Sequence, residues 1–191
     1  MKHIKFIISV LVCISLCVGY FYYLNVRNEG DPADKVDPTS VVSKLISKDI
    51  ENHYPETPRE VVELYSSIIK EFYTGKLSSE EIEKLCNQAR LLFDEELLLN
   101  NPQEQHLEDL NTEISEYLRE GKYISDYVVQ RNADVTKYTF NDEEYASVKA
   151  VYYIRKGTDL DKTYEEYILR KDSSGRWKIL YWTVTSPTVI K

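Results

Sequence analysis

The order of apolar and polar residues divides the chain into an apolar start, a helical middle and a β-rich end. The first segment, from Phe6 to Val26, contains no formally charged residue. As a helix it would be about 31 Å long, which matches the hydrocarbon core of a bilayer. We therefore expect a transmembrane helix over residues 6–26, preceded by a short N-terminus over residues 1–5.

The charges around this segment indicate its orientation. Lys2 and Lys5 precede it, whereas Arg27 is soon followed by acidic residues. The positive-inside rule then predicts a single-pass protein of the cell membrane, with a cytoplasmic N-terminus and an extracytoplasmic C-terminal part. A signal peptide cleaved after Gly19 is the alternative, but the apolar run continues past this residue, which favours an uncleaved anchor.

A polar stretch rich in Gly, Pro and Asp follows the apolar segment, and it predicts a linker or stalk over residues 27–53. Near its end, apolar residues between Ser40 and Ile50 predict a short amphipathic helix that leads into the next part. We expect one extracytoplasmic domain over residues 54–188, because this length suits a single core.

Three helix starts are marked in the first half of this domain. Thr57 with Glu60, and Ser78 with Glu81, have the spacing of capping boxes. Asn101 before a proline predicts a third start. Apolar residues then repeat at helical spacing after each start, and the apolar character of the second helix continues up to the third start. The sequence therefore predicts three capped helices.

After Gly121 the apolar residues alternate, which indicates β-strands. In the last strand, simple alternation places Trp177 and Trp182 on opposite faces. Helices followed by strands predict an α+β fold, in which about three N-terminal helices pack on a curved antiparallel sheet of about four strands. The strands are expected over residues 123–139, 144–156, 162–171 and 176–186.

Composition narrows the possible partners. The chain has 32 acidic and 24 basic side chains, a net charge of −8, which disfavours a nucleic-acid partner. Two of its three cysteines lie in the apolar segment, and Cys86 falls on the buried stripe of a helix, so neither a disulfide in the domain nor a cysteine-based zinc site is expected. The 16 tyrosines are explained most simply by packing in a half-exposed sheet.

The titratable residues do not form a recognisable catalytic pattern. His3, His53 and His106 lack metal-ligand spacing, and His106 is expected to be solvated. The carboxylate runs at 94–96, 142–144 and 165–166 could be acid–base pairs or a cation site, but solvated charged faces explain them better. No phosphate-binding loop or nucleophile motif is present in the sequence. We therefore expect no enzyme activity, no metal and no cofactor.

The order of elements, together with the closing hairpin DSSGRWKILYW, resembles the nuclear transport factor 2-like superfamily, which has a cystatin-like fold. The resemblance implies a cone in which a curved sheet wraps around helices and leaves a pocket. Tyr152, Tyr167 and Trp182 are the candidate pocket-lining residues, with simple core packing as the alternative. Isomerase-type members of the superfamily use a buried carboxylate and a tyrosine, which no sequence motif would reveal.

Two further stretches, YPETPREVVELY at 54–65 and ARLLFDEELL at 89–98, lie behind the apolar segment. They resemble an uncharacterised family of membrane-anchored proteins from anaerobic Gram-positive bacteria, known only as a domain of unknown function. This resemblance implies a location and a fold, but it assigns no functional residues.

Three functions are compatible with these features. The favoured hypothesis is a membrane-anchored binding or scaffold module that contacts a protein partner or another copy of itself, because the anchored domain has no recognisable catalytic constellation. Anchoring raises the effective concentration of a weak binder, so modest affinity would suffice. The first alternative is a receptor that binds a small ligand in the pocket. The second alternative is a small-molecule enzyme of the isomerase or dehydratase type, which would need a pocket carboxylate with a raised pKa.

Overall fold

The computed structural model of the protein describes residues 40–187. The expected transmembrane helix over residues 6–26 and most of the expected stalk lie outside this range. Over residues 40–187, none of the helices combines the length and the apolar character that a membrane span needs.

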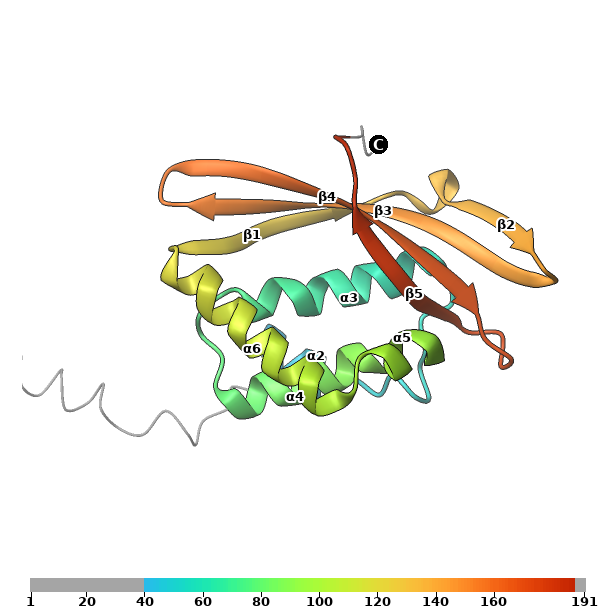
Figure 1. Ribbon diagram of the computed structural model, residues 1–191, viewed down its shortest axis with the longest axis horizontal. Helices are drawn as coiled ribbons and strands as arrows, with labels where there is room; N and C mark the ends of the chain where they lie inside the picture. The colour runs from blue at the N-terminus through green and yellow to red at the C-terminus, as the bar shows by residue number, and fades with distance from the viewer. Residues whose placement is uncertain (1–39, 188–191) are drawn as a thin grey trace, which may run out of the picture. The chain divides into compact units, whose positions relative to one another are not determined.

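Helices and strands are segregated along the chain, and the fold is α+β. The helices come first: α2 (Val41–Ile46), α3 (Pro58–Phe72), α4 (Ser79–Arg90), α5 (Glu95–Asn100) and α6 (Gln103–Arg119). The strands form one five-stranded antiparallel sheet, and the helices lie on one face of it (Figure 1). The strands are β1 (Lys122–Val129), β2 (Thr136–Phe140), β3 (Glu143–Lys156), β4 (Asp159–Lys171) and β5 (Trp177–Val184).

The first two helix starts confirm the capping signals. The Thr57 and Ser78 side chains accept hydrogen bonds from the backbone N–H groups of Glu60 and Glu81, at 3.2 Å and 3.3 Å. The prediction for the third start is wrong by one residue, because the N-cap of α6 is a proline without a side-chain cap. The Asn101 amide instead donates to a backbone carbonyl in α5.

The second predicted helix is broken into α4 and α5. Between them, Phe93 forms a parallel bridge with Ile179 of β5. The Ile179 N–H donates to the Leu92 carbonyl, and the Asp94 N–H donates to the Ile179 carbonyl, both at 2.8 Å. The continuous apolar pattern therefore does not form a continuous helix, because backbone groups between α4 and α5 form hydrogen bonds with the edge of β5 instead.

The sheet is organised around the long strand β3. Strand β4 pairs along its whole length on one side. On the other side β1 and β2 pair with its two halves, with Val129 opposite Ala150 and Thr136 opposite Ser147. The single strand predicted over residues 123–139 is therefore two strands, separated by a short 3₁₀ turn (Asn132–Asp134).

A β-bulge in β5 reverses the predicted side of its later residues. Ile179 and Tyr181 pair with consecutive residues of β4, which leaves Leu180 as an extra residue. Trp182 consequently lies on the same face as Trp177, toward the helices. The expectation of opposite faces is wrong because it counted simple alternation across the bulge.

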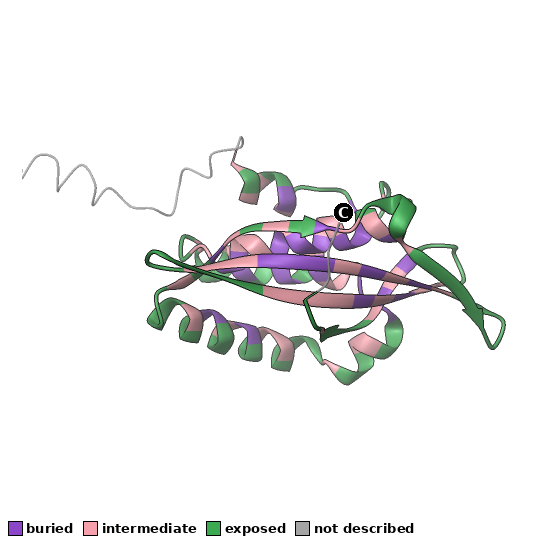
Figure 2. Cartoon of the chain, turned by 90° about the horizontal axis from the view of Figure 1, so that it is seen from above, coloured by how far each residue is buried: buried purple, intermediate pink, exposed green. Residues whose placement is uncertain are grey.

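The core lies between the helices and the sheet, with α3 packed against β1, β3 and β5. Figure 2 shows buried residues gathered in the middle of the long strands and on the helix turns that face them. Leu45 of α2 and Ile50 also belong to this core. Residues 41–53, predicted as the end of the stalk, therefore pack with the domain.

Candidate functional site

A cavity of about 230 Å³ lies between the helices and the strands β4 and β5. Helices α3, α4 and α6 provide most of its apolar lining, and the link between α4 and α5 contributes Phe93. Three carboxylates also line it: Glu165 from β4, and Asp109 and Glu113 from α6. The cavity therefore combines an apolar wall with acidic groups.

Four aromatic rings form one wall of the cavity. The Tyr65 ring centroid lies 5.6 Å from that of Phe93, 5.8 Å from that of Tyr167 and 5.7 Å from that of Trp182. The first two contacts have the edge-to-face geometry that aromatic pairs favour. Trp182 is 37% exposed, so it lies at the mouth while the other rings are buried.

A chain of hydrogen bonds runs from the cavity into the core. The Tyr167 hydroxyl donates to Glu165 at 2.5 Å, and it is 2.7 Å from the Tyr152 hydroxyl. Tyr152 in turn is 2.8 Å from the buried Ser66 hydroxyl. Because each hydroxyl has one proton, an ionised Glu165 makes Tyr152 the donor to Tyr167 and Ser66 the donor to Tyr152. The hydroxyls of Tyr167, Tyr152 and Ser66 are thus each paired.

The environment of Glu165 disfavours its charge. Burial raises the pKa of this carboxyl, the hydrogen bond from Tyr167 lowers it, and the charge of Glu113 raises it further. The second carboxylate oxygen, Oε1, has no hydrogen-bond partner among residues 40–187. One oxygen of a half-buried carboxylate is therefore available to a bound molecule.

Replacing Glu165 by glutamine is expected to increase the free energy of unfolding at neutral pH by about 1 kcal/mol, because the amide removes a poorly solvated charge and still accepts from Tyr167. The folded-state pKa is raised above the ordinary value of 4.5. The wild type should therefore lose stability relative to Glu165→Gln as the pH rises from the unfolded-state pKa to the folded-state pKa. Urea denaturation at several pH values measures this; a difference that grows toward acidic pH would contradict it.

His106 lines the cavity, so the prediction that it is solvated is wrong. Its Nδ1 is 3.2 Å from an Arg90 guanidinium nitrogen and 3.8 Å from the Cys86 Sγ. Arg90 can only donate, so Nδ1 is the acceptor and the ring is neutral. Burial lowers the pKa of His106, and the charge of Arg90 lowers it further. Cys86 is buried as expected, and burial raises the pKa of its thiol.

The three residues predicted from the sequence are brought close together. Tyr167 and Trp182 line the cavity, and Tyr152 lies behind Tyr167 through the hydrogen bond between their hydroxyls. The expectation that the run 165–166 is a solvated face is wrong for Glu165, which lines the cavity and lies two residues before Tyr167 on the same face of β4. Sequence reasoning also missed Tyr65, which the helical pattern assigned only to the core.

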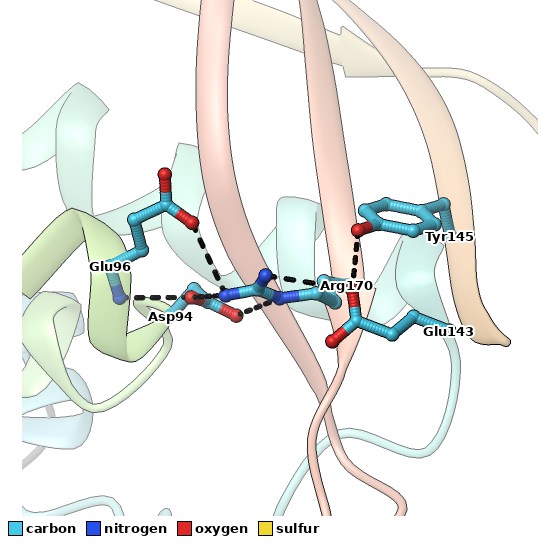
Figure 3. Close-up of polar contacts among 5 residues, drawn as sticks. All are labelled: Asp94, Glu96, Glu143, Tyr145 and Arg170. Atoms are coloured by element: carbon cyan, nitrogen blue, oxygen red, sulfur yellow. Dashed lines mark hydrogen bonds and ion pairs between the residues drawn. The ribbon is translucent and has the colours of Figure 1, made fainter. Parts of the chain in front are cut away.

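A second, more open depression of about 490 Å³ lies beside Arg170 on the other side of Phe93. Arg170 pairs there with Asp94, Glu96 and Glu143 (Figure 3). Arg170 Nη2 and Nε contact the two oxygens of Asp94 at 2.5 Å and 3.1 Å, with Glu96 and Glu143 nearby at 3.5 Å and 3.7 Å. Asp94 also caps α5 through the Glu96 N–H.

The charged residues around Arg170 have a structural role. The Asp94 side chain is 6% exposed, so the expectation that the whole run 94–96 is solvated is wrong for this residue. The hydrogen bond to Asp94 raises the pKa of Arg170, which keeps the guanidinium charged. The pair holds the start of α5 against β4, and we take the aromatic cavity as the candidate functional site.

The acidic groups of the two sites do not form a metal centre. Over residues 40–187, no group of three or more His, Cys, Asp or Glu side chains could hold a metal ion. The cavity therefore offers aromatic faces, hydroxyl groups and carboxylates as its means of recognition.

Comparison with known proteins gives a family but no activity. No curated protein matches the chain. Residues 1–182 match the family model described as Domain of unknown function (DUF6715). Because this match covers nearly the whole chain, including the helices and strands that form the cavity, the protein belongs to the DUF6715 family.

Proposed function

We propose that the domain is a receptor that binds a small organic molecule in the aromatic cavity. The observation that carries the proposal is a cavity of about 230 Å³ with four aromatic rings and an available carboxylate oxygen. A dry cavity of about 150 Å³ can hold benzene, so this one has room for a somewhat larger molecule. Concave, mostly apolar sites with a few polar groups are the usual form of ligand pockets.

The same proposal includes the cellular location of the receptor. The apolar segment over residues 6–26 would anchor the protein in the cell membrane and present the domain on the extracytoplasmic side. The helices on one face of the antiparallel sheet, with a cavity between the layers, support a cone of the nuclear transport factor 2-like type. A ligand would then be bound outside the cell membrane.

The arrangement of the hydroxyls favours binding over isomerase-type catalysis. A tyrosine that stabilises a developing oxyanion must donate its proton to the substrate. The Tyr167 hydroxyl instead donates to Glu165, and Tyr152 donates to Tyr167. The hydroxyl protons of Tyr167 and Tyr152 are therefore used within the protein.

The test is a fragment screen by ligand-observed NMR on the full chain and on the variant Ala89→Phe. Ala89 is buried and lines the cavity, so a phenyl ring at this position should occupy the space of the ligand. We expect fragments that bind the wild type to lose affinity about tenfold or more in the variant, which corresponds to about 1.4 kcal/mol.

The matched control is Leu99→Phe, because Leu99 is 81% exposed and does not line the cavity. It should leave fragment binding unchanged. Circular dichroism should show that both variants are folded, since the added ring in Ala89→Phe fills an existing space. Fragments that bind equally well to the wild type and to folded Ala89→Phe would contradict the proposed site.

Partner binding or self-association is the second candidate function. It is favoured by apolar side chains on the hairpin of β2 and β3, where the rings of Tyr138 and Tyr145 stack at 5.5 Å and Phe140 is 62% exposed. Crosslinking in intact membranes, compared between the wild type and Phe140→Ser, tests this role. Identical crosslinks in the two proteins would count against this surface.

A further inference from the structure

The charges of the aromatic cavity have one sign. Glu165 contributes a carboxylate from the sheet, and Asp109 and Glu113 contribute two more from one face of α6, spaced by four residues. Within residues 40–187, the lining contains no lysine or arginine. His106 is neutral, and Arg90 contacts it from outside the lining while donating to the Asn101 carbonyl at 2.8 Å.

Two polar atoms of the lining lack a partner among the described residues. Tyr65 is only 4% exposed, yet no described residue forms a hydrogen bond with its hydroxyl. The Oε1 atom of Glu165 is in the same situation. Both residues line the same cavity. Neither oxygen is sealed from solvent, so each can accept a hydrogen bond from a molecule bound in the cavity.

We infer that the cavity binds a protonated organic amine, with the ammonium group between Glu165 and Tyr65 and the apolar body against the aromatic wall. This inference rests on the proposed receptor function and specifies its ligand class. A primary ammonium has three N–H donors and no acceptor. It could therefore donate one hydrogen bond to Glu165 Oε1 and another to the Tyr65 hydroxyl oxygen.

The aromatic wall and the cavity mouth support the same class of ligand. A cation within about 6 Å of the centre of an aromatic ring is attracted by the partial negative charge on the face of that ring. Asp109 and Glu113 are exposed residues of the lining, and acidic groups at a cleft raise the local concentration of cations. A carboxylate or phosphate ligand would meet three like charges, and a neutral ligand would leave Glu165 buried without a counter-charge.

The experiment is a calorimetric titration of the full chain with three probes of similar shape: phenethylammonium, 2-phenylethanol and phenylacetate. We expect phenethylammonium to bind about tenfold more tightly than 2-phenylethanol, and phenylacetate to bind most weakly, because a hydrogen bond to a charged group contributes more than a neutral one. Glu165→Gln should lower the affinity for phenethylammonium about tenfold and leave that for 2-phenylethanol unchanged.

The matched control is Glu166→Gln, which removes the same charge from the neighbouring residue of β4. Glu166 pairs with Ser147 rather than lining the cavity, so this variant should bind all three probes like the wild type. Equal losses of phenethylammonium affinity in both variants would show a general charge effect and would overturn the inference.

Other outcomes separate this inference from the proposed function. Tighter binding of 2-phenylethanol or phenylacetate that Ala89→Phe abolishes would overturn the ligand class and leave the receptor function in place. Absence of binding by all three probes would also overturn the ligand class, and the fragment screen would then decide on the receptor function by itself.

Discussion

Replacing Asp94 by alanine is expected to lower the free energy of unfolding by about 3 kcal/mol, because it leaves a partly buried guanidinium without its carboxylate. The Arg170 side chain is 22% exposed, so water can compensate only part of the loss. The same change removes the side-chain cap of α5, where Asp94 accepts from the Glu96 N–H at 3.0 Å. Urea denaturation followed by circular dichroism measures the effect.

The control for Asp94→Ala is Asp161→Ala, the same substitution at an exposed residue of the strand that carries Arg170. It should change stability by less than about 0.5 kcal/mol. A double-mutant cycle with Arg170→Met then isolates the pairwise energy from the loss of the cap. Equal effects of the two aspartate substitutions would show that the ion pair does not stabilise the link between α4 and α5.

Replacing Leu85 by alanine is also expected to cost about 3 kcal/mol, since deleting a fully buried leucine side chain removes apolar burial and leaves a cavity. Leu85 has no exposed surface. Helix α4 packs against α2, α3 and α6, so its apolar stripe joins the outer helices to the helix that covers the sheet. The measurement is urea denaturation with the midpoint and the slope fitted separately.

The control for Leu85→Ala is Leu99→Ala, which removes the same atoms from an exposed position of α5. Its effect should stay below about 0.5 kcal/mol. A loss for Leu99→Ala as large as that for Leu85→Ala would contradict the burial that the structure assigns to the two leucines.

Features that depend on neighbouring residues could be predicted from the sequence. The capping boxes of α3 and α4 join residues three positions apart, so residue types alone reveal them. The alternation within β3 similarly predicts that Ala146, Val148 and Ala150 share one face, and all three are buried. The α+β class followed from the change of period after Gly121.

Features that depend on distant residues could not be predicted in this way. Asp94 looks like part of a charged surface run, and its partner Arg170 is 76 residues away. The break between α4 and α5 arises because β5 offers hydrogen bonds to Leu92 and Asp94, which no local pattern records. The bulge at Leu180 shifts alternation by one residue without any glycine or proline to mark it.

The same difference between neighbouring and distant residues applies to the candidate site. Tyr167 and Trp182 could be named as candidates because the resemblance to the nuclear transport factor 2-like superfamily implied a pocket against the sheet. The role of Glu165 instead depends on the helices that bury it. His106 could not be placed from sequence, because its polar neighbours on α6 predicted exposure to solvent. In the structure, contacts with Arg90 and Phe93 hold its ring at the cavity.

The bridge between Phe93 and Ile179 has a consequence for the solubility of the protein. The edge of a sheet offers unpaired N–H and C=O groups to which another chain can add as a strand, and this is a common start of aggregation. At Ile179 both groups are already bound to Leu92 and Asp94. We expect aggregation on mild heating to begin once the segment between α4 and α5 detaches, before the sheet itself unfolds.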